Sequence, residues 1–338
     1  MRLFALALLL ALPAQAADWL NPPADDTPPT LAPLPAEAAA AFAAVREDPA
    51  PPEIVRNSHY WISNEYRHDL FRDTIAGAGG MLLGVGTDQN YLLAGWARSE
   101  VLFLMDFDIA IPRIHKVYGL AFKVSRTPEE FLAFWGNDRA SDILAYLEAT
   151  YGTEQEGKRM VQAFRTAQPL IRHRLTKTLR DYKKRGVTSF LDDADQYRHV
   201  RDLWRTGRVF ALRGDLTASE TMADIGAAAR KANLVMRVIY MSNAPQYFDF
   251  DAQFRTNIAG MPVDEKSWYV HTLTRGAFGY ADGFYHYNVE PGLNFQQWMA
   301  ETKVKKLTQI LKHRTVQPTQ GFSIMQKSPA EAGVKPAP

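Results

Sequence analysis

The 338-residue sequence contains no cysteine. Without thiols the chain forms no disulfide, and it offers neither a cysteine nucleophile nor a thiolate ligand for a metal ion. A chain of this length can bury a core large enough for one large domain or two smaller ones. The fold must therefore be stabilised by packing and hydrogen bonding alone.

An excess of charge of either sign is also missing. The sequence has 39 basic and 37 acidic residues, which gives a formal net charge of +2. Proteins that bind nucleic acids usually carry a strong basic excess. We therefore expect no nucleic-acid partner and look for a small-molecule ligand instead.

Long hydrophobic runs are absent apart from one short run at the N-terminus. A single arginine precedes an apolar run from Leu3 to Leu12, and Ala14-Gln15-Ala16 follows it. This order predicts a signal peptide at residues 1–16, cleaved after Ala16. The run is shorter than the roughly 20 residues that span a bilayer. We therefore expect a periplasmic or secreted bacterial protein with no stable membrane anchor after signal cleavage.

The remaining chain divides by composition. Residues 17–52 are rich in proline and alanine and predict an extended lead-in, with a short helix from Pro35 to Val45. Residues 53–312 predict a single α/β domain that carries a helical insertion at about 127–185. Residues 313–338 contain four prolines and predict a disordered tail.

Buried strands and helices alternate within the predicted domain. Gly80 to Val85, Val101 to Met105, Val209 to Arg213 and Leu234 to Met241 are apolar runs of strand length, and helical periodicity follows the first three. This alternation predicts a mostly parallel, doubly wound sheet with helices on both faces. Residues 267–289 predict an antiparallel hairpin at one edge of the sheet.

Small and polar residues recur where these strands end, which is the edge where such sheets bind their ligands. Gly84, Gly86 and Asp88 follow the first strand, Asp106 the second and Asp215 the third. Ser242 and Asn243 follow the fourth strand, with Tyr247 close behind. Glycines allow close approach of the backbone to a ligand, and an acid after the second strand commonly binds a ribose diol.

Several familiar site motifs do not occur. Gln89 stands where a dinucleotide-binding turn would have its third glycine, and the sequence has no Walker A loop and no Gly-x-Ser-x-Gly elbow. These absences argue against a nicotinamide-dependent dehydrogenase, a P-loop nucleotidase and an α/β-hydrolase.

The strand-end residues give the chain a resemblance to the class I S-adenosylmethionine-dependent methyltransferase fold. The resemblance implies that Gly84, Gly86, Asp88, Asp106 and Asp215 bind the cofactor, S-adenosylmethionine. It also implies that Ser242, Asn243 and Tyr247 face the substrate. No catalytic residue follows from it.

More narrowly, the chain resembles an uncharacterised bacterial family with a methyltransferase-like fold, over roughly residues 55–300. Five segments carry this resemblance: Ser63-Asn64-Glu65, Gly84 to Tyr91, Phe190 to Asp193, Gly214-Asp215-Leu216 and Tyr240 to Tyr247. The family supplies no reaction. The sequence thus leaves open whether the protein is an enzyme.

Two hypotheses remain at this point. The first is an exported methyltransferase-like protein that binds a small polar or nucleoside-like ligand at the strand ends. S-adenosylmethionine is a cytoplasmic metabolite, so an exported protein must reach it some other way or bind something else. The second hypothesis is a non-catalytic periplasmic binding or envelope-associated protein that keeps the fold. It predicts a pocket relined by aromatic side chains: Tyr66, Tyr91, Trp96 and Tyr247.

Other polar residues have simpler interpretations. Asp192, Asp193 and Asp195 lack the spacing of a calcium loop and are expected to cap a helix. His271 and His286 could be neighbours across the predicted hairpin, and His115 could be a general base if it faces the crevice. Partly exposed surface histidines are the simpler expectation for all three, and no metal site is predicted.

Overall fold

The computed structural model describes residues 19–23, 25–54 and 57–334, so the predicted signal peptide lies outside the described residues. In this part of the chain eight strands form one sheet in the order β3-β2-β1-β4-β5-β6-β8-β7. The strands are β1 (Met81–Val85), β2 (Val101–Asp106), β3 (Val209–Arg213), β4 (Met236–Tyr240), β5 (Trp268–Leu273), β6 (His286–Pro291), β7 (Thr315–Val316) and β8 (Phe322–Ile324).

Strands β1 to β5 run parallel to one another, with β1 at their centre between β2 and β4. Strand β6 is antiparallel to β5, β8 is parallel to β6, and β7 is antiparallel to β8. The predicted fold class, a mostly parallel α/β sheet with an antiparallel hairpin, is confirmed.

The central strands β1 and β2 are apolar up to Asp106, the last residue of β2, because both faces of the sheet are covered. Leu82 and Leu104 point into one buried hydrophobic cluster, and Met81, Leu83 and Phe103 point into the other. Side chains alternate between the two faces along a strand, so a strand that is buried on both sides has no polar position.

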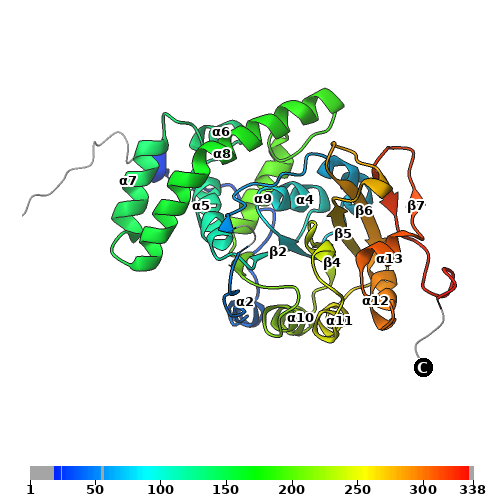
Figure 1. Ribbon diagram of the computed structural model, residues 1–338. Coiled ribbons are helices and arrows are strands. Elements are labelled where there is room, and N and C mark those ends of the chain that lie inside the picture. The colour runs from blue at the N-terminus through cyan, green and yellow to red at the C-terminus, as the bar shows by residue number, and fades with distance from the viewer. Residues whose placement is uncertain (1–18, 24, 55–56, 335–338) are drawn as a thin grey trace, which may run out of the picture.

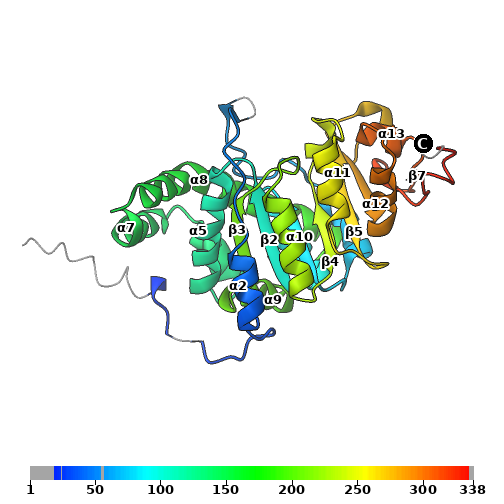
Figure 2. The ribbon, with the colours of Figure 1, turned by 90° about the horizontal axis from the view of Figure 1, so that it is seen from below.

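Helices cover both faces of the sheet (Figures 1 and 2). α4, α5 and α9 lie on one face, and α2, α10 and α11 lie on the other. The helices are α2 (Ala36–Ala43), α3 (Arg72–Ile75), α4 (Gln89–Ala97), α5 (Ala110–Val124), α6 (Pro128–Phe134), α7 (Ala140–Tyr151), α8 (Gln155–Arg185), α9 (Ala194–Arg205), α10 (Thr221–Lys231), α11 (Ala252–Ala259), α12 (Gly292–Ala300) and α13 (Leu307–Leu311), with short 3₁₀ turns η2 (His68–Phe71), η3 (Ala244–Gln246) and η4 (Gly276–Phe278).

The segment predicted as a helical insertion consists of α6, α7 and α8. The long helix α8 packs against α5 and α7, and α7 lies at the far side of the molecule from β7 (Figure 1). Across the described ranges, no helix combines the length and the apolar character needed to cross a bilayer.

The C-terminal segment corrects the prediction of a disordered tail. Residues 315–316 and 322–324 form β7 and β8, and Met325 is fully buried. The hairpin of β5 and β6 is therefore not the edge of the sheet, because β8 pairs with β6. Asn294 donates hydrogen bonds to the carbonyl oxygens of Met325 and Lys327, which anchors the segment.

The described part of the proline- and alanine-rich lead-in packs against the domain, which corrects the expectation of an extended segment before residue 53. Phe42 on α2 is buried against Phe103 and Phe210. Asp25 forms an ion pair with Arg201 on α9. Proline spacing gave no indication of these contacts, which depend on residues more than sixty positions away.

Candidate functional site

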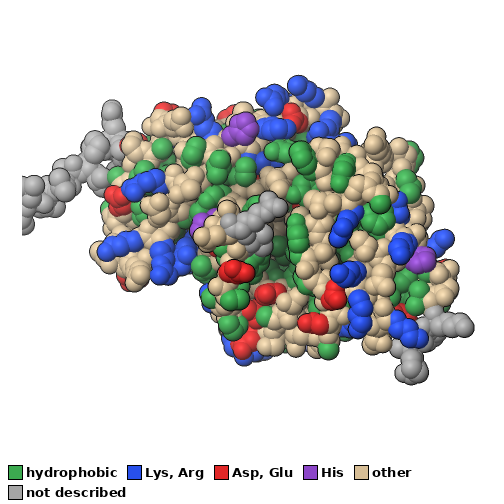
Figure 3. Space-filling model, in the orientation of Figure 1, with side chains coloured by type: hydrophobic (Ala, Val, Ile, Leu, Met, Phe, Trp, Pro, Cys, Tyr) green, Lys and Arg blue, Asp and Glu red, His purple; other side chains and the backbone are tan. Residues whose placement is uncertain are grey.

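A cavity of about 520 Å³ lies at the carboxyl ends of β1, β2 and β4. Residues that follow these strands form one wall. The other side is closed by Ile54, Ser58, Tyr60, Ile62, Ser63, Asn64, Thr274, Phe284 and Tyr285. Figure 3 shows a hollow near the middle of the face that is turned toward the viewer, with acidic side chains beside it. The position is the one expected for a ligand site in an open α/β sheet.

The structure brings together only part of the predicted set. Gly86, Asp106, Ser242, Asn243 and Tyr247 line the cavity. The other three predicted residues, which are Gly84, Asp88 and Asp215, do not.

The glycine turn is filled by the protein's own side chains. A side chain at position 84 would overlap the amide group of Asn90, and one at Gly86 would meet Gln89. Gln89 donates to the carbonyl oxygen of Val85 at 3.0 Å and accepts from the Thr87 amide at 3.2 Å. Gly84 therefore makes room for Asn90 rather than for a ligand.

Asp88 is buried behind this turn. Its carboxylate pairs with Arg174 of α8 at 2.8 Å and accepts the backbone N–H of Ser63 at 2.9 Å. Both charged side chains are only 1% exposed. Asp88 therefore ties the turn to α8 and to the segment that covers the cavity.

The end of β3 is occupied by the lead-in segment. The carboxylate of Asp48 accepts the backbone N–H groups of Asp215, Glu220 and Thr221 at 2.9 to 3.2 Å, which caps the start of α10. The Asp215 carboxylate in turn accepts from Thr217 within the same turn. Asp215 thus closes a local turn next to the cavity without entering its wall.

Two carboxylates remain in the wall. The N–H of Asp108 donates to Asp106 at 3.0 Å, and Nδ1 of His59 lies 2.7 Å from the Asp108 carboxylate. Asp106 is partly exposed to the cavity, yet the surrounding protein removes most of its water. This desolvation, with the negative charges of Asp108 and Asp215, raises the pKa of Asp106 to about 7.

Aromatic side chains stand around the cavity. Tyr60, Tyr247 and Phe284 line it and are 47%, 69% and 67% exposed. Exposed apolar side chains that gather around one cavity, unlike single scattered ones, are typical of a binding surface. The aromatic relining suggested by the sequence is thus found at Tyr247 only, because Tyr91 and Trp96 are buried in the core and Tyr66 packs beneath Lys177.

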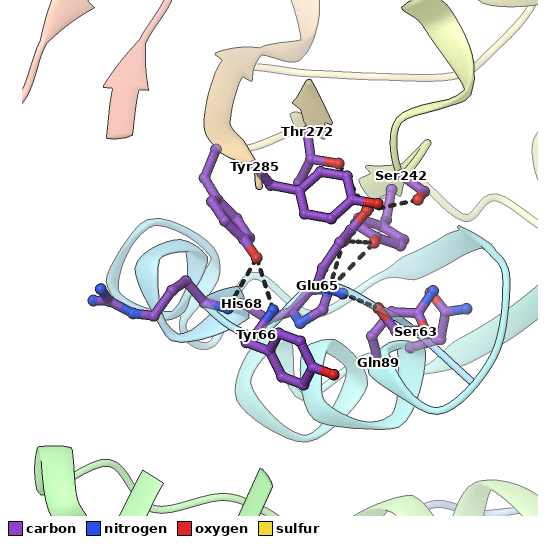
Figure 4. Close-up of polar contacts among 12 residues, drawn as sticks. Ser63, Glu65, Tyr66, His68, Gln89, Ser242, Thr272 and Tyr285 are labelled. Carbon is purple, nitrogen blue, oxygen red and sulfur yellow. Dashed lines mark hydrogen bonds and ion pairs between the residues drawn. The ribbon is translucent and has the colours of Figure 1, made fainter. Parts of the chain in front are cut away.

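A buried carboxylate that the strand-end pattern missed lies behind the wall. Glu65 accepts hydrogen bonds from Ser242 and Thr272, each at 2.7 Å, from His68 at 2.8 Å, and from the Tyr240 hydroxyl (Figure 4). Burial opposes its charge, but the donors His68, Tyr240 and Thr272 outweigh burial and hold the pKa of Glu65 below its usual value.

Ser242 connects this network to the cavity. Its φ of 51° lies in the left-handed region, which non-glycine residues seldom adopt. The unusual backbone places its hydroxyl between the cavity and Glu65. Strained backbone of this kind is concentrated at binding and active sites.

The remaining candidates are structural. His115 is fully buried, with Nε2 2.8 Å from the Gly86 carbonyl and Nδ1 2.8 Å from the Tyr91 hydroxyl, so it does not face the cavity. His271 and His286 are buried and contact Asn288 and Ser323, so the expectation of surface histidines is wrong for all three.

Asp193 caps α9, Asp192 accepts from the Ser189 amide, and Asp195 pairs with Arg98. Among the described residues, no group of three or more acidic or histidine side chains could hold a metal ion.

The chain belongs to the family described as a domain of unknown function (DUF7790), whose model matches residues 60–326. No curated protein matches the sequence. The matched region contains the whole parallel part of the sheet and the residues of the cavity wall from Tyr60 onward.

Proposed function

We propose that this member of the DUF7790 family binds a small polar, nucleoside-like ligand in the cavity at the carboxyl ends of β1, β2 and β4. The observation that carries the proposal is the convergence of two carboxylates, Asp106 and Asp108, with exposed aromatic side chains around one cavity of about 520 Å³. Cavities of this size suit ligands of small-metabolite dimensions.

The chemistry of the wall supports this class of ligand. A carboxylate can accept two hydrogen bonds from adjacent hydroxyl groups, as acids after the second strand commonly do with a ribose. Exposed rings such as Tyr60, Tyr247 and Phe284 can stack on a planar base or on the apolar face of a sugar. The amide of Asn243, 3.4 Å from the Tyr247 hydroxyl, adds a directional polar group.

S-adenosylmethionine fits this site only in part. Asp106 suits its ribose, but no lysine or arginine of the described chain lines the cavity to receive the methionine carboxylate. The Thr87 amide of the glycine turn is already bound to Gln89, and Asp215 lies outside the wall. The residues therefore do not fit the cofactor as a whole, and we propose ligand binding without methyl transfer.

A catalytic role is the second candidate, and it depends on Asp106. A carboxyl group with a pKa of about 7 can donate or accept a proton near neutral pH. Such a group in a ligand cavity is suited to general acid–base catalysis. Turnover lost on Asp106→Asn substitution while ligand affinity is retained would distinguish this role from binding alone.

Binding can be tested with adenosine by ligand-observed NMR on the wild-type protein and on Ala244→Trp. Ala244 lines the cavity, so an indole there should fill it. Leu170→Trp on α8 is a control, because position 170 is 43% exposed and lies outside the cavity. We expect binding to wild type and Leu170→Trp, and loss of binding in Ala244→Trp with its fold intact. Equal binding in all three would contradict the proposed site.

We also propose that the protein acts after export. The mass of the mature protein isolated from cells tests this point. A chain beginning at Ala17 is expected, and an uncleaved N-terminus in the mature protein would contradict export.

A further inference from the structure

Three hydroxyl groups of the cavity wall donate their hydrogens to the protein itself, which limits what they can bind. Thr87 donates its hydrogen to Asp88 at 3.3 Å, Thr274 to Gln246 at 3.0 Å, and Ser242 to Glu65 at 2.7 Å. A hydroxyl has one hydrogen and two lone pairs. Each of these three groups therefore offers only lone pairs to a ligand.

The direction of the hydrogen bond from Ser242 is fixed by Glu65. A carboxylate held in its ionised form accepts hydrogen bonds and donates none. Glu65 is kept ionised by its donors, although it is only 1% exposed. The hydroxyl hydrogen of Ser242 thus points away from the cavity, and its oxygen is left as an acceptor in the wall.

The charges around the cavity also favour a ligand that donates hydrogen bonds. Asp106 and Asp108 lie in the wall and Glu65 lies just behind it, while no lysine or arginine of the described chain lines the cavity. The aromatic rings of Tyr60 and Tyr247 add negative π faces that attract cations. An anionic group would meet repulsion here, whereas a cationic donor would meet acceptors.

We propose that the cavity takes a ligand with a protonated amino group, bound by the carboxylates of Asp106 and Asp108 and by the oxygen of Ser242. Glu65 is the positioning residue that turns the Ser242 oxygen toward the ligand. This inference rests on the proposed function, because it specifies the ligand class of the same cavity.

Such binding is coupled to protonation of Asp106. The charged groups near Asp106 are Asp108 and Asp215, with His59 on the far side of Asp108. Arg213 is in register with Asp106 on β3, but its guanidinium binds the Asp48 carbonyl and lies near Glu47. An ammonium group favours ionised Asp106, so its affinity should rise as pH increases through about 7.

The test compares ligands of equal shape and different charge by calorimetry. One set is 5′-amino-5′-deoxyadenosine, adenosine and adenosine 5′-carboxylate, and the other is 2-phenylethylamine, 2-phenylethanol and phenylacetate. Hydrogen bonds to charged groups predict that each amine binds about ten- to a hundredfold more tightly than its alcohol, and the acid most weakly. The preference should fall in Asp106→Asn and in Ser242→Ala.

Thr272→Val is the matched control for the role of Glu65. Thr272 donates to the same Glu65 oxygen as Ser242 but does not line the cavity, so the ratio of amine to alcohol affinity should stay unchanged. If Ser242→Ala does not fold, Ser242→Gly removes the same hydroxyl and tolerates the positive φ. A merely structural role for Ser242 would lower both affinities and leave their ratio unchanged, which would overturn the assignment.

The two proposals fail in different ways. If an alcohol or an acid binds as tightly as its amine, the cavity binds ligands but the inferred ligand class is wrong. If none of the six compounds binds the wild-type protein, both the proposed function and the inferred ligand class are contradicted.

Discussion

Some residues at this site occupy positions of a ligand-binding motif but contact the protein's own side chains instead of a ligand. Gly84 occupies the place of a cofactor-binding glycine, yet the space above it holds Asn90. Asp106 and Ser242 occupy equivalent positions after their strands and do reach the cavity. Position relative to a strand end therefore predicted which residues to inspect, but side-chain packing decides which of them a ligand can contact.

The Gly84→Ala substitution tests this distinction. The added methyl group overlaps the Asn90 amide, and forcing an extra group into a packed site costs typically about 1–3 kcal/mol of unfolding free energy. Urea unfolding should show this loss, and Gly84→Ala/Asn90→Ala should recover much of it. Unchanged stability with lost ligand binding would instead place Gly84 in the ligand site.

Glu290 on β6 is a buried acid, and within the described part of the chain its carboxylate accepts a hydrogen bond from the Asn294 amide alone, at 3.4 Å. Burial raises the pKa of its carboxyl well above the usual value, so the fold favours the protonated form. Between the pKa of the unfolded state and the raised pKa of the folded state, each pH unit lowers the free energy of unfolding by about 1.4 kcal/mol. Glu290→Gln should therefore stabilise the protein at pH 7 and have little effect near pH 4, as measured by denaturant unfolding at both pH values.

Glu65 marks the limit of sequence analysis at this scale. It precedes β1 by sixteen positions in a segment without regular secondary structure. No pattern in the sequence therefore predicts that its carboxylate contacts Ser242. Its partners Tyr240, Ser242 and Thr272 come from the ends of β4 and β5. Only the tertiary arrangement brings these groups to one buried carboxylate.

At the scale of secondary-structure elements, the ion pair of Asp88 and Arg174 links α8 to the glycine turn. Both groups are buried, and removing one partner leaves a charge without compensation. Arg174→Met should therefore destabilise the protein by about 3–5 kcal/mol, whereas Asp88→Asn/Arg174→Met should be less destabilised. A double-mutant cycle by chemical denaturation measures this coupling. Additive effects of the two substitutions would show that α8 is held by its apolar contacts alone.

The elements divide clearly between those that sequence periodicity predicts and those that it does not. β1 to β4 are largely apolar runs, and their predicted positions agree with the structure to within two residues. β7 and β8 span only two and three residues in a proline-containing segment, so they have no periodicity of their own. They form because β6 presents a free edge, which is a property of the assembled sheet.

At the scale of the whole molecule, three buried histidines link stability to pH. Burial is the main cause that lowers the pKa values of His115, His271 and His286 to about 4, 3 and 4. Folded-state pKa values below the unfolded value of about 6.5 mean that stability is complete above pH 6.5 and is lost as pH falls toward 4. Each unit by which the pKa of a histidine is lowered corresponds to about 1.4 kcal/mol of unfolding free energy.

Acid titration of stability in the Glu290→Gln background isolates this effect, because Glu290 itself acts in the opposite direction. We expect the free energy of unfolding to fall between pH 6.5 and 4, and His115→Gln to reduce the slope by about one proton. A slope that is the same in both proteins would mean that His115 is not held neutral by the fold.

The central claim is that the cavity at the carboxyl ends of β1, β2 and β4 holds a small ligand. Native mass spectrometry of protein purified from its own compartment tests it most directly, with the Ala244→Trp variant measured in parallel. We expect an added small-molecule mass on the wild-type protein that is absent from the folded variant. An equal added mass on both proteins, or none on the wild type, would contradict it.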